Sequence, residues 1–119
     1  MNNTTVIIYG IKNCDTMKKA FNRLEEKGIS YQFHDYKKEG ISKEKLAEWL
    51  KQSDLMDVVN NKGTTYKKLS PEQQEALKSQ GSAIPIIMEY TSVIKRPIVE
   101  VAGKLLIGLN PNEWAEAGI

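Results

Sequence analysis

A single cysteine lies where the backbone would activate its thiol. Cys14 follows an apolar, β-branched run at residues 6–9 that Gly10 ends, and it directly precedes an amphipathic helix. The first N–H groups of a helix lack internal partners and carry a partial positive charge, which stabilises a thiolate. Lys12 is a nearby cation that also favours the thiolate, whereas the carboxylate of Asp15 disfavours it. We therefore predict that Cys14 is a nucleophilic thiol.

The alternative is an inert thiol, because a lone cysteine is usually a small buried hydrophobe. Two features favour the reactive thiol. The neighbours Lys12, Asn13 and Asp15 are polar, and Cys14 lies outside the apolar stripe of the helix, which comprises Met17, Ala20, Phe21 and Leu24. Met17 also stands where a Cys-x-x-Cys pair would have its second cysteine. A disulfide formed at Cys14 must therefore be resolved by a thiol from outside the chain, such as glutathione or a partner thiol protein.

Composition excludes several classes of function. The chain has 119 residues and a formal net charge of +2, which fits one domain and argues against nucleic acid or an anionic membrane as a partner. Its apolar runs are too short to span a membrane. One cysteine excludes a disulfide framework and a multi-cysteine metal site. Residues 1–5 lack the layout of a signal peptide. We expect a cytoplasmic protein without a bound metal or cofactor.

The first third predicts a strand, a helix and a second strand. Gly28 stands where a left-handed C-terminal cap ends the helix. Tyr31 and Phe33 then alternate with Gln32 and His34, which predicts a strand to about residue 36 and places His34 on the surface. Two strands joined by one crossover helix are typical of a parallel βαβ unit.

The middle of the chain, about residues 41–91, predicts helices. Ser42 caps one helix, residues 55–59 suggest a short second one, and residues 60–63 form a break. Ser70 begins a helix with a capping box that we expect to run to about Ser79 and to stop before Gly81. Residues 84–90 favour a further helix with Pro85 in its first turn.

The last third predicts a ββα unit. Strands at 98–101 and 105–107 flank a tight turn at Ala102-Gly103, and Asn110 caps a C-terminal helix that carries Trp114. The order βαβ, helical insertion, ββα predicts one α/β domain over residues 1–119, with a core at 1–40 and 92–119. Taken alone, the charges of Lys62 and Arg96 fit solvated loops.

Four segments of the sequence resemble the ArsC-like superfamily of small thioredoxin-fold proteins, and within it the YffB-type branch. They are YGIKNCDTMKKA at 9–20, FHDY at 33–36, GTTYKKL at 63–69 and IKRPI at 94–98. The resemblance covers nearly the whole chain. It implies a thioredoxin-like core with a central helical insertion. It also implies that Cys14 is the nucleophile, that Arg96 binds the oxyanion and that the peptide bond before Pro97 is cis.

The resemblance further implies a glutathione-dependent thiol reductase or an arsenate reductase-like enzyme. Its substrate would be a small oxyanion or a disulfide, with glutathione or a glutaredoxin-like protein as co-substrate. We expect Lys12, Asn13, Asn60, Lys62 and Pro97 to help Arg96 to hold that substrate. Glutaredoxin-coupled arsenate reductases have two further arginines, which align near Asn60 and Gly108, and a histidine that Gly10 replaces. The alternative is an Spx-type regulator that binds RNA polymerase, although Met17 removes the Cys-x-x-Cys switch.

Overall fold

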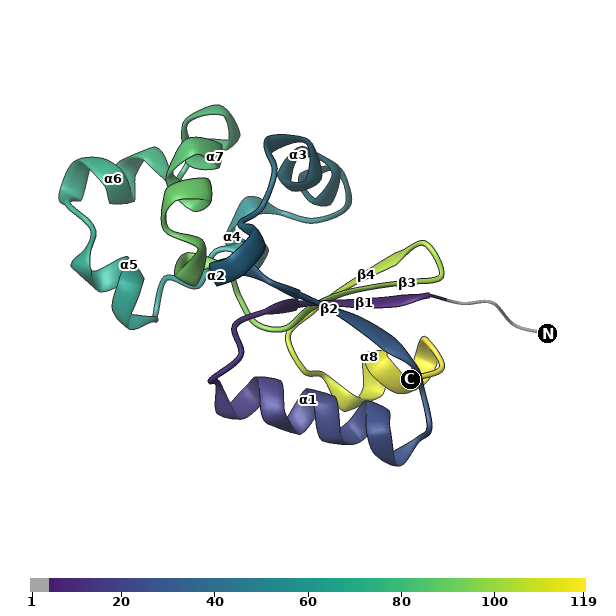
Figure 1. The fold of residues 1–119 in the computed structure, drawn as a ribbon. Coiled ribbons are helices and arrows are strands. Elements are labelled where there is room, and N and C mark those ends of the chain that lie inside the picture. The colour runs from purple at the N-terminus through teal and green to yellow at the C-terminus, as the bar shows by residue number, and fades with distance from the viewer. Residues whose placement is uncertain (1–4) are drawn as a thin grey trace. The chain divides into compact units, whose positions relative to one another are not determined.

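The computed structural model describes residues 5–119 (Figure 1). The prediction made for the layout of residues 1–5 therefore lies mostly outside the described residues. The chain divides into two compact units, one made of the residues up to Asp35 with Arg96–Ile119 and the other of Tyr36–Lys95. The helical insertion predicted at 41–91 lies within the second unit.

The first unit is built on a sheet of four strands. These are β1 (Val6–Gly10), β2 (Tyr31–Asp35), β3 (Ile98–Val101) and β4 (Lys104–Ile107), in the order β2-β1-β3-β4. β1 pairs in parallel with β2 and antiparallel with β3, which pairs antiparallel with β4. Helix α1 (Asp15–Glu26) makes the parallel crossover, and α8 (Pro111–Glu116) lies with it on one side of the sheet (Figure 1). The predicted thioredoxin-like α/β core is confirmed.

The apolar stripe of α1 builds the core of this unit. Met17, Ala20 and Leu24 are fully buried against residues of the sheet and of α8, namely Val6, Ile8, Val99, Val101, Leu106 and Trp114. Gly28, at a φ of 67°, ends α1 as predicted. The N–H of Ile29 donates to the carbonyl of Leu24 at 2.9 Å, and that of Gly28 to Glu25 at 3.1 Å. These two bonds are those of a Schellman cap.

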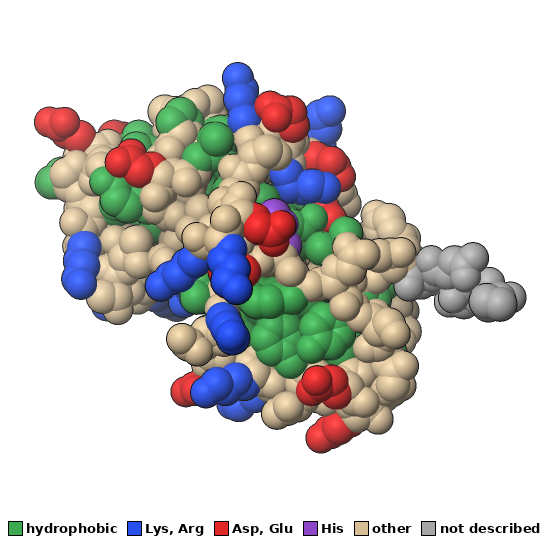
Figure 2. All heavy atoms as spheres, viewed as in Figure 1, with side chains coloured by type: hydrophobic (Ala, Val, Ile, Leu, Met, Phe, Trp, Pro, Cys, Tyr) green, Lys and Arg blue, Asp and Glu red, His purple; other side chains and the backbone are tan. Residues whose placement is uncertain are grey.

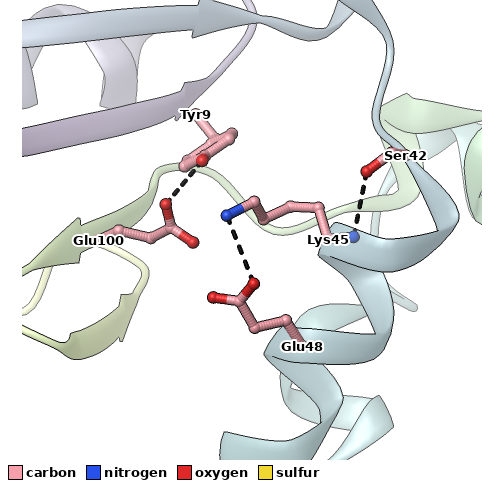
Figure 3. Close-up of polar contacts among 5 residues, drawn as sticks. All are labelled: Tyr9, Ser42, Lys45, Glu48 and Glu100. Carbon is pink, nitrogen blue, oxygen red and sulfur yellow. Dashed lines mark hydrogen bonds and ion pairs between the residues drawn. The ribbon is translucent and has the colours of Figure 1, made fainter.

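The second unit is helical. It contains α2 (Tyr36–Glu39), α3 (Lys43–Gln52), α4 (Leu55–Val58), α5 (Thr64–Lys68), α6 (Pro71–Ala76), α7 (Gln80–Glu89) and the short 3₁₀ helix η1 (Thr91–Val93). The hydroxyl of Ser42 accepts the N–H of Lys45 at 3.1 Å, and Lys45 pairs with Glu48 at 3.7 Å (Figure 3). The capping box at Ser70 is present as predicted.

Two helix boundaries in this unit differ from the prediction. α6 ends at Ala76 rather than near Ser79, and α7 begins at Gln80. Gly81 therefore lies in the first turn of α7 and Pro85 in its interior. A proline there removes one helical hydrogen bond. The burial of Ala83, Ile84 and Ile87 offsets that loss.

The hairpin and the last helix follow the prediction. Val101 pairs with Lys104, so Ala102 and Gly103 form a two-residue turn, at φ values of 50° and 77°. The side chain of Asn110 accepts the N–H groups of Asn112 and Glu113, which caps α8. Within residues 5–119, every helix is too short or too polar to cross a lipid bilayer.

Candidate active site

Cys14 is the N-cap of α1. Its backbone is extended, with φ −142° and ψ 131°, and its carbonyl accepts the N–H of Lys18 at 3.0 Å. The residue is half-buried. As a thiol it makes no capping hydrogen bond, because neutral sulfur is a weak acceptor. The backbone N–H groups of Met17 and Thr16 instead stabilise the thiolate.

Arg96 adds a charge to this site. Burial raises the pKa of the Cys14 thiol. The N–H groups of Met17 and Thr16 lower it, as do the charge and the hydrogen bond of the Arg96 guanidinium, and together they outweigh burial. The pKa of Cys14 therefore lies below its ordinary value. The thiolate is the nucleophilic form of cysteine, so these groups raise the fraction of reactive sulfur at neutral pH.

The segment that carries Arg96 is held by the end of the hairpin. The Arg96–Pro97 peptide bond is cis, and the ring of Pro97 is buried. The carbonyl of Pro97 accepts the N–H of Gly108 at 2.8 Å. The carbonyl of Gly108 in turn accepts the indole N–H of Trp114 at 3.1 Å. A fully buried tryptophan thus fixes the backbone beside Arg96.

Met17 packs against the strand that leads to Cys14. A Cβ built on Gly10 would lie 2.5 Å from both the sulfur and the terminal methyl of Met17. Met17 is fully buried, so those atoms have little room to move. One side chain therefore occupies the position of a second Cys-x-x-Cys thiol and fills the space that a side chain at position 10 would need.

The structure brings together some of the residues predicted for the site. Lys12 and Asn13 are exposed in the loop directly before Cys14. Asn60 and Lys62 belong to the second unit, where the side chain of Asn60 accepts the N–H of Lys62 at 3.1 Å. This bond makes residues 60–62 a local turn. The roles of these four residues in binding stay predictions.

Sequence analysis missed two contributors to the geometry. The first is Gly108, whose N–H bonds to Pro97 and whose carbonyl bonds to Trp114. Its backbone is left-handed, at φ 80°, and a glycine directly after a strand is the only sequence signal for that conformation. The contact of Gly10 with Met17 has no local signal at all.

His34 differs from the prediction in its burial. It is half-buried rather than on the surface. Its ring lies 4.8 Å from that of Tyr9, whose hydroxyl donates to Glu100 at 2.7 Å (Figure 3). These residues alternate with the core-facing residues of β1 and β3, so they lie on the other face of the sheet from α1.

The second unit holds a separate apolar hollow of about 630 Å³. Lys43 of α3 and several residues of α7 line it, namely Gly81, Ile84, Pro85, Met88 and Glu89. None of these lining residues is a cysteine, serine or histidine. We therefore place the candidate active site at Cys14 and Arg96 instead.

The fold and the activated cysteine define a thioredoxin-like protein with one thiol. The chain belongs to the ArsC family, whose model matches residues 9–117.

Relatives support this membership over nearly the full length. A solved structure of a protein named YFFB is 42% identical and has a TM-score of 0.89, and the match covers 94% of this chain and 97% of that one. An arsenate reductase of Haemophilus influenzae is 29% identical, over 94% of this chain and 97% of its own. The global transcriptional regulator Spx of Streptococcus agalactiae is 24% identical, over 85% of this chain and 74% of its own.

Proposed function

We propose that the protein is a glutathione-dependent thiol–disulfide oxidoreductase with Cys14 as its one nucleophile. The observation that carries this proposal is the stabilisation of the Cys14 thiolate by the first turn of α1 and by Arg96. A half-buried thiol whose pKa is lowered beside a cation is typical of a catalytic rather than a structural cysteine. A reducing, cytoplasmic compartment suits such a free thiol.

The reaction would run as two thiol–disulfide exchanges. The Cys14 thiolate attacks one sulfur of a mixed disulfide R–S–S–G, in which G is glutathione. A bond forms between Cys14 and the glutathione sulfur, and R leaves as a thiolate that takes a proton from water. A second glutathione thiolate then attacks the glutathione sulfur of the Cys14 adduct. Oxidised glutathione forms, and the electron pair of the broken bond returns to Cys14.

Cations suit the glutathione half of this substrate. Glutathione carries two carboxylates, and Arg96 and Lys12 are positive groups at or next to Cys14. Asn13 adds an amide in the same loop. Asn60 and Lys62 of the second unit remain candidates for further contacts. A glutaredoxin-like protein would serve as the resolving thiol equally well.

The similarity to Spx supports a second candidate, a regulator that binds RNA polymerase without catalysis. This chain has one cysteine, and Met17 stands in the second Cys-x-x-Cys position. It therefore cannot form an internal disulfide as a switch. Capture of RNA polymerase by the purified Cys14→Ser protein, which keeps any binding surface and lacks the thiol, would support this candidate.

The enzymatic proposal is tested by steady-state reduction of the mixed disulfide of glutathione and free cysteine. Reduced glutathione is the electron donor, and oxidised glutathione is measured. We expect the wild-type protein to increase the rate in proportion to its concentration and Cys14→Ser to lose this effect. Lys104→Gln is the control, because it removes an exposed cation of the same unit without touching the thiol. A rate equal to the uncatalysed one for wild type would refute the proposal.

A further inference from the structure

One half-buried cation acts directly on the thiol of Cys14. Arg96 is half-buried, and its guanidinium hydrogen-bonds to the sulfur. Figure 2 shows further Lys and Arg side chains gathered where α1 begins in Figure 1. The charged side chains that precede and follow Cys14 in the chain, those of Lys12, Asp15 and Lys18, are all exposed, so water and salt screen them. What holds Arg96 in place therefore influences the reactivity of the sulfur.

Arg96 is anchored through the residues that follow it. The first unit resumes at Arg96, and the pairing of β1 with β3 lays the segment before β3 beside the one that leads from β1 to Cys14. Pro97 has no N–H, so its carbonyl is the one backbone group with which it can join β4. That carbonyl accepts the N–H of Gly108 at 2.8 Å, one residue beyond the last pair of β3 and β4.

A buried tryptophan completes this anchor. The left-handed backbone of Gly108 turns the chain out of β4, and its carbonyl accepts the indole N–H of Trp114 at 3.1 Å. Trp114 is fully buried in the core of the first unit. Cys14 packs against that core directly, whereas Arg96 is tied to it through two hydrogen bonds in series. The same core therefore supports both the sulfur and its cation.

A buried indole N–H needs an acceptor in any protein. The alternative is thus that Gly108 only satisfies the indole, without any consequence for the thiol. A role in positioning is favoured because Gly108 makes both bonds, one with each side of its backbone. A displacement of Gly108 is therefore passed to the carbonyl beside Arg96.

We propose that Trp114 is a positioning residue for Cys14. Its indole N–H holds Gly108, and Gly108 holds the backbone from which the guanidinium of Arg96 reaches the sulfur. Trp114 is fully buried, so it acts through these bonds rather than on a substrate. Without the indole N–H, the guanidinium spends less time at the sulfur and the thiolate loses part of its stabilisation. This inference rests on the proposed function, because it names a residue that prepares the thiol for that reaction.

The test measures the rate of Cys14 alkylation by iodoacetamide against pH, which reports the pKa of the thiol in the folded protein. Trp114→Phe keeps an aromatic ring in the core and removes the N–H. We expect its profile to move to higher pH and its rate at neutral pH to fall by about twofold to fivefold. In the Arg96→Gln background, Trp114→Phe should leave the profile unchanged, because the cation that it positions is absent.

Two controls separate positioning from a general loss of stability. Trp49→Phe removes the other indole of the chain, which is also fully buried but lies in α3 of the second unit. Leu24→Val removes one methylene from the same core as Trp114. Neither should move the profile. If Trp114→Phe does not fold, replacement of Trp114 by benzothienylalanine keeps the shape of the indole with sulfur in place of the N–H, and the same shift is expected.

The inference would be overturned by a Trp114→Phe profile that coincides with wild type, by an equal shift in the Arg96→Gln background, or by the same shift in either control. Alkylation requires no turnover, so this result is separate from the enzymatic proposal. A shift that depends on Arg96, with no turnover of the mixed disulfide of glutathione and cysteine by wild type, would support positioning and refute the proposed function. Turnover by wild type without that shift would keep the enzyme and refute positioning.

Discussion

Opposing effects act on the sulfur atom of Cys14. Burial disfavours the charged thiolate, whereas two backbone N–H groups and one guanidinium favour it, and the balance lowers the pKa. The two N–H groups come with the helix and need no particular side chain. Arg96 is the contribution that a substitution can remove.

Arg96→Gln should therefore raise the pKa of Cys14. Thiolate alkylation should then begin at a higher pH, and the rate at neutral pH should fall by a few-fold, because each pKa unit changes the thiolate fraction about tenfold below the pKa. The measurement is the alkylation rate against pH. Arg96→Lys keeps the positive charge, so its alkylation profile against pH should lie between the profiles of wild type and Arg96→Gln. A profile for Arg96→Gln that coincides with wild type would show that Arg96 does not act on the thiol.

Gly10→Ala should destabilise the protein by about 1–3 kcal/mol, because its Cβ overlaps the buried Met17 side chain. Met17→Ala removes the clashing atoms, so Gly10→Ala should cost almost nothing further in that background. Urea unfolding measures the free-energy cost of Gly10→Ala in the wild-type and Met17→Ala backgrounds. Gly81→Ala is the control, since a Cβ there meets nothing within 4 Å, and it should be neutral or slightly stabilising. Equal costs of Gly10→Ala in both backgrounds would contradict the contact.

At the scale of elements, caps and apolar periodicity predicted most of the fold. The stripe of α1, the left-handed Gly28 and the side chains of Ser42, Ser70 and Asn110 each fix a helix end within the sequence. Helices α2 and α5 were missed, because four or five residues are too few to show a helical period. The sequence predicted that α7 begins at residue 84, whereas it begins at Gln80. Gly81 and Pro85 both disfavour a helix locally, and tertiary burial overrides them.

The hairpin turn offers a direct test at this scale. A two-residue turn with positive φ at both positions favours Asn-Gly, and Ala102 adopts φ 50° at a steric cost. Ala102→Asn should raise the free energy of unfolding by up to about 1 kcal/mol. Ala102→Val should lower it, because β-branched residues resist positive φ. Thermal or urea unfolding measures both changes in the free energy of unfolding. An increase in that free energy for Ala102→Val would contradict this turn geometry.

At the scale of the whole molecule, the site depends on residues from both ends of the chain. Cys14 could be predicted from local pattern alone, as a cysteine at a helix start outside the apolar stripe. Nothing local joins it to Arg96, which by itself resembles a solvated loop charge. That pairing came from the resemblance to a family, because only the β1-β3 pairing brings the two segments into one sheet.

We expect arsenate reduction with glutathione and glutaredoxin to be weak or absent. The resemblance implies that the two further arginines of glutaredoxin-coupled arsenate reductases would align near Asn60 and Gly108, and an arginine at Gly108 would have to adopt φ 80°. The side chain of Asn60 is engaged in a local turn. Turnover of arsenate is compared with that of the mixed disulfide of glutathione and cysteine at equal enzyme concentration. Arsenate turnover of equal rate would contradict this expectation.

The central claim is that Cys14 accepts glutathione from a disulfide and returns it to a second glutathione. Intact-protein mass spectrometry tests it most directly, because the chain has one cysteine and any glutathione adduct must lie there. The account predicts one adduct per chain after incubation with oxidised glutathione at neutral pH, and its complete removal by reduced glutathione. It also predicts faster adduct formation than for an unstructured peptide of residues 9–20. Adduct formation no faster than in that peptide, or an adduct that reduced glutathione cannot remove, would contradict the account.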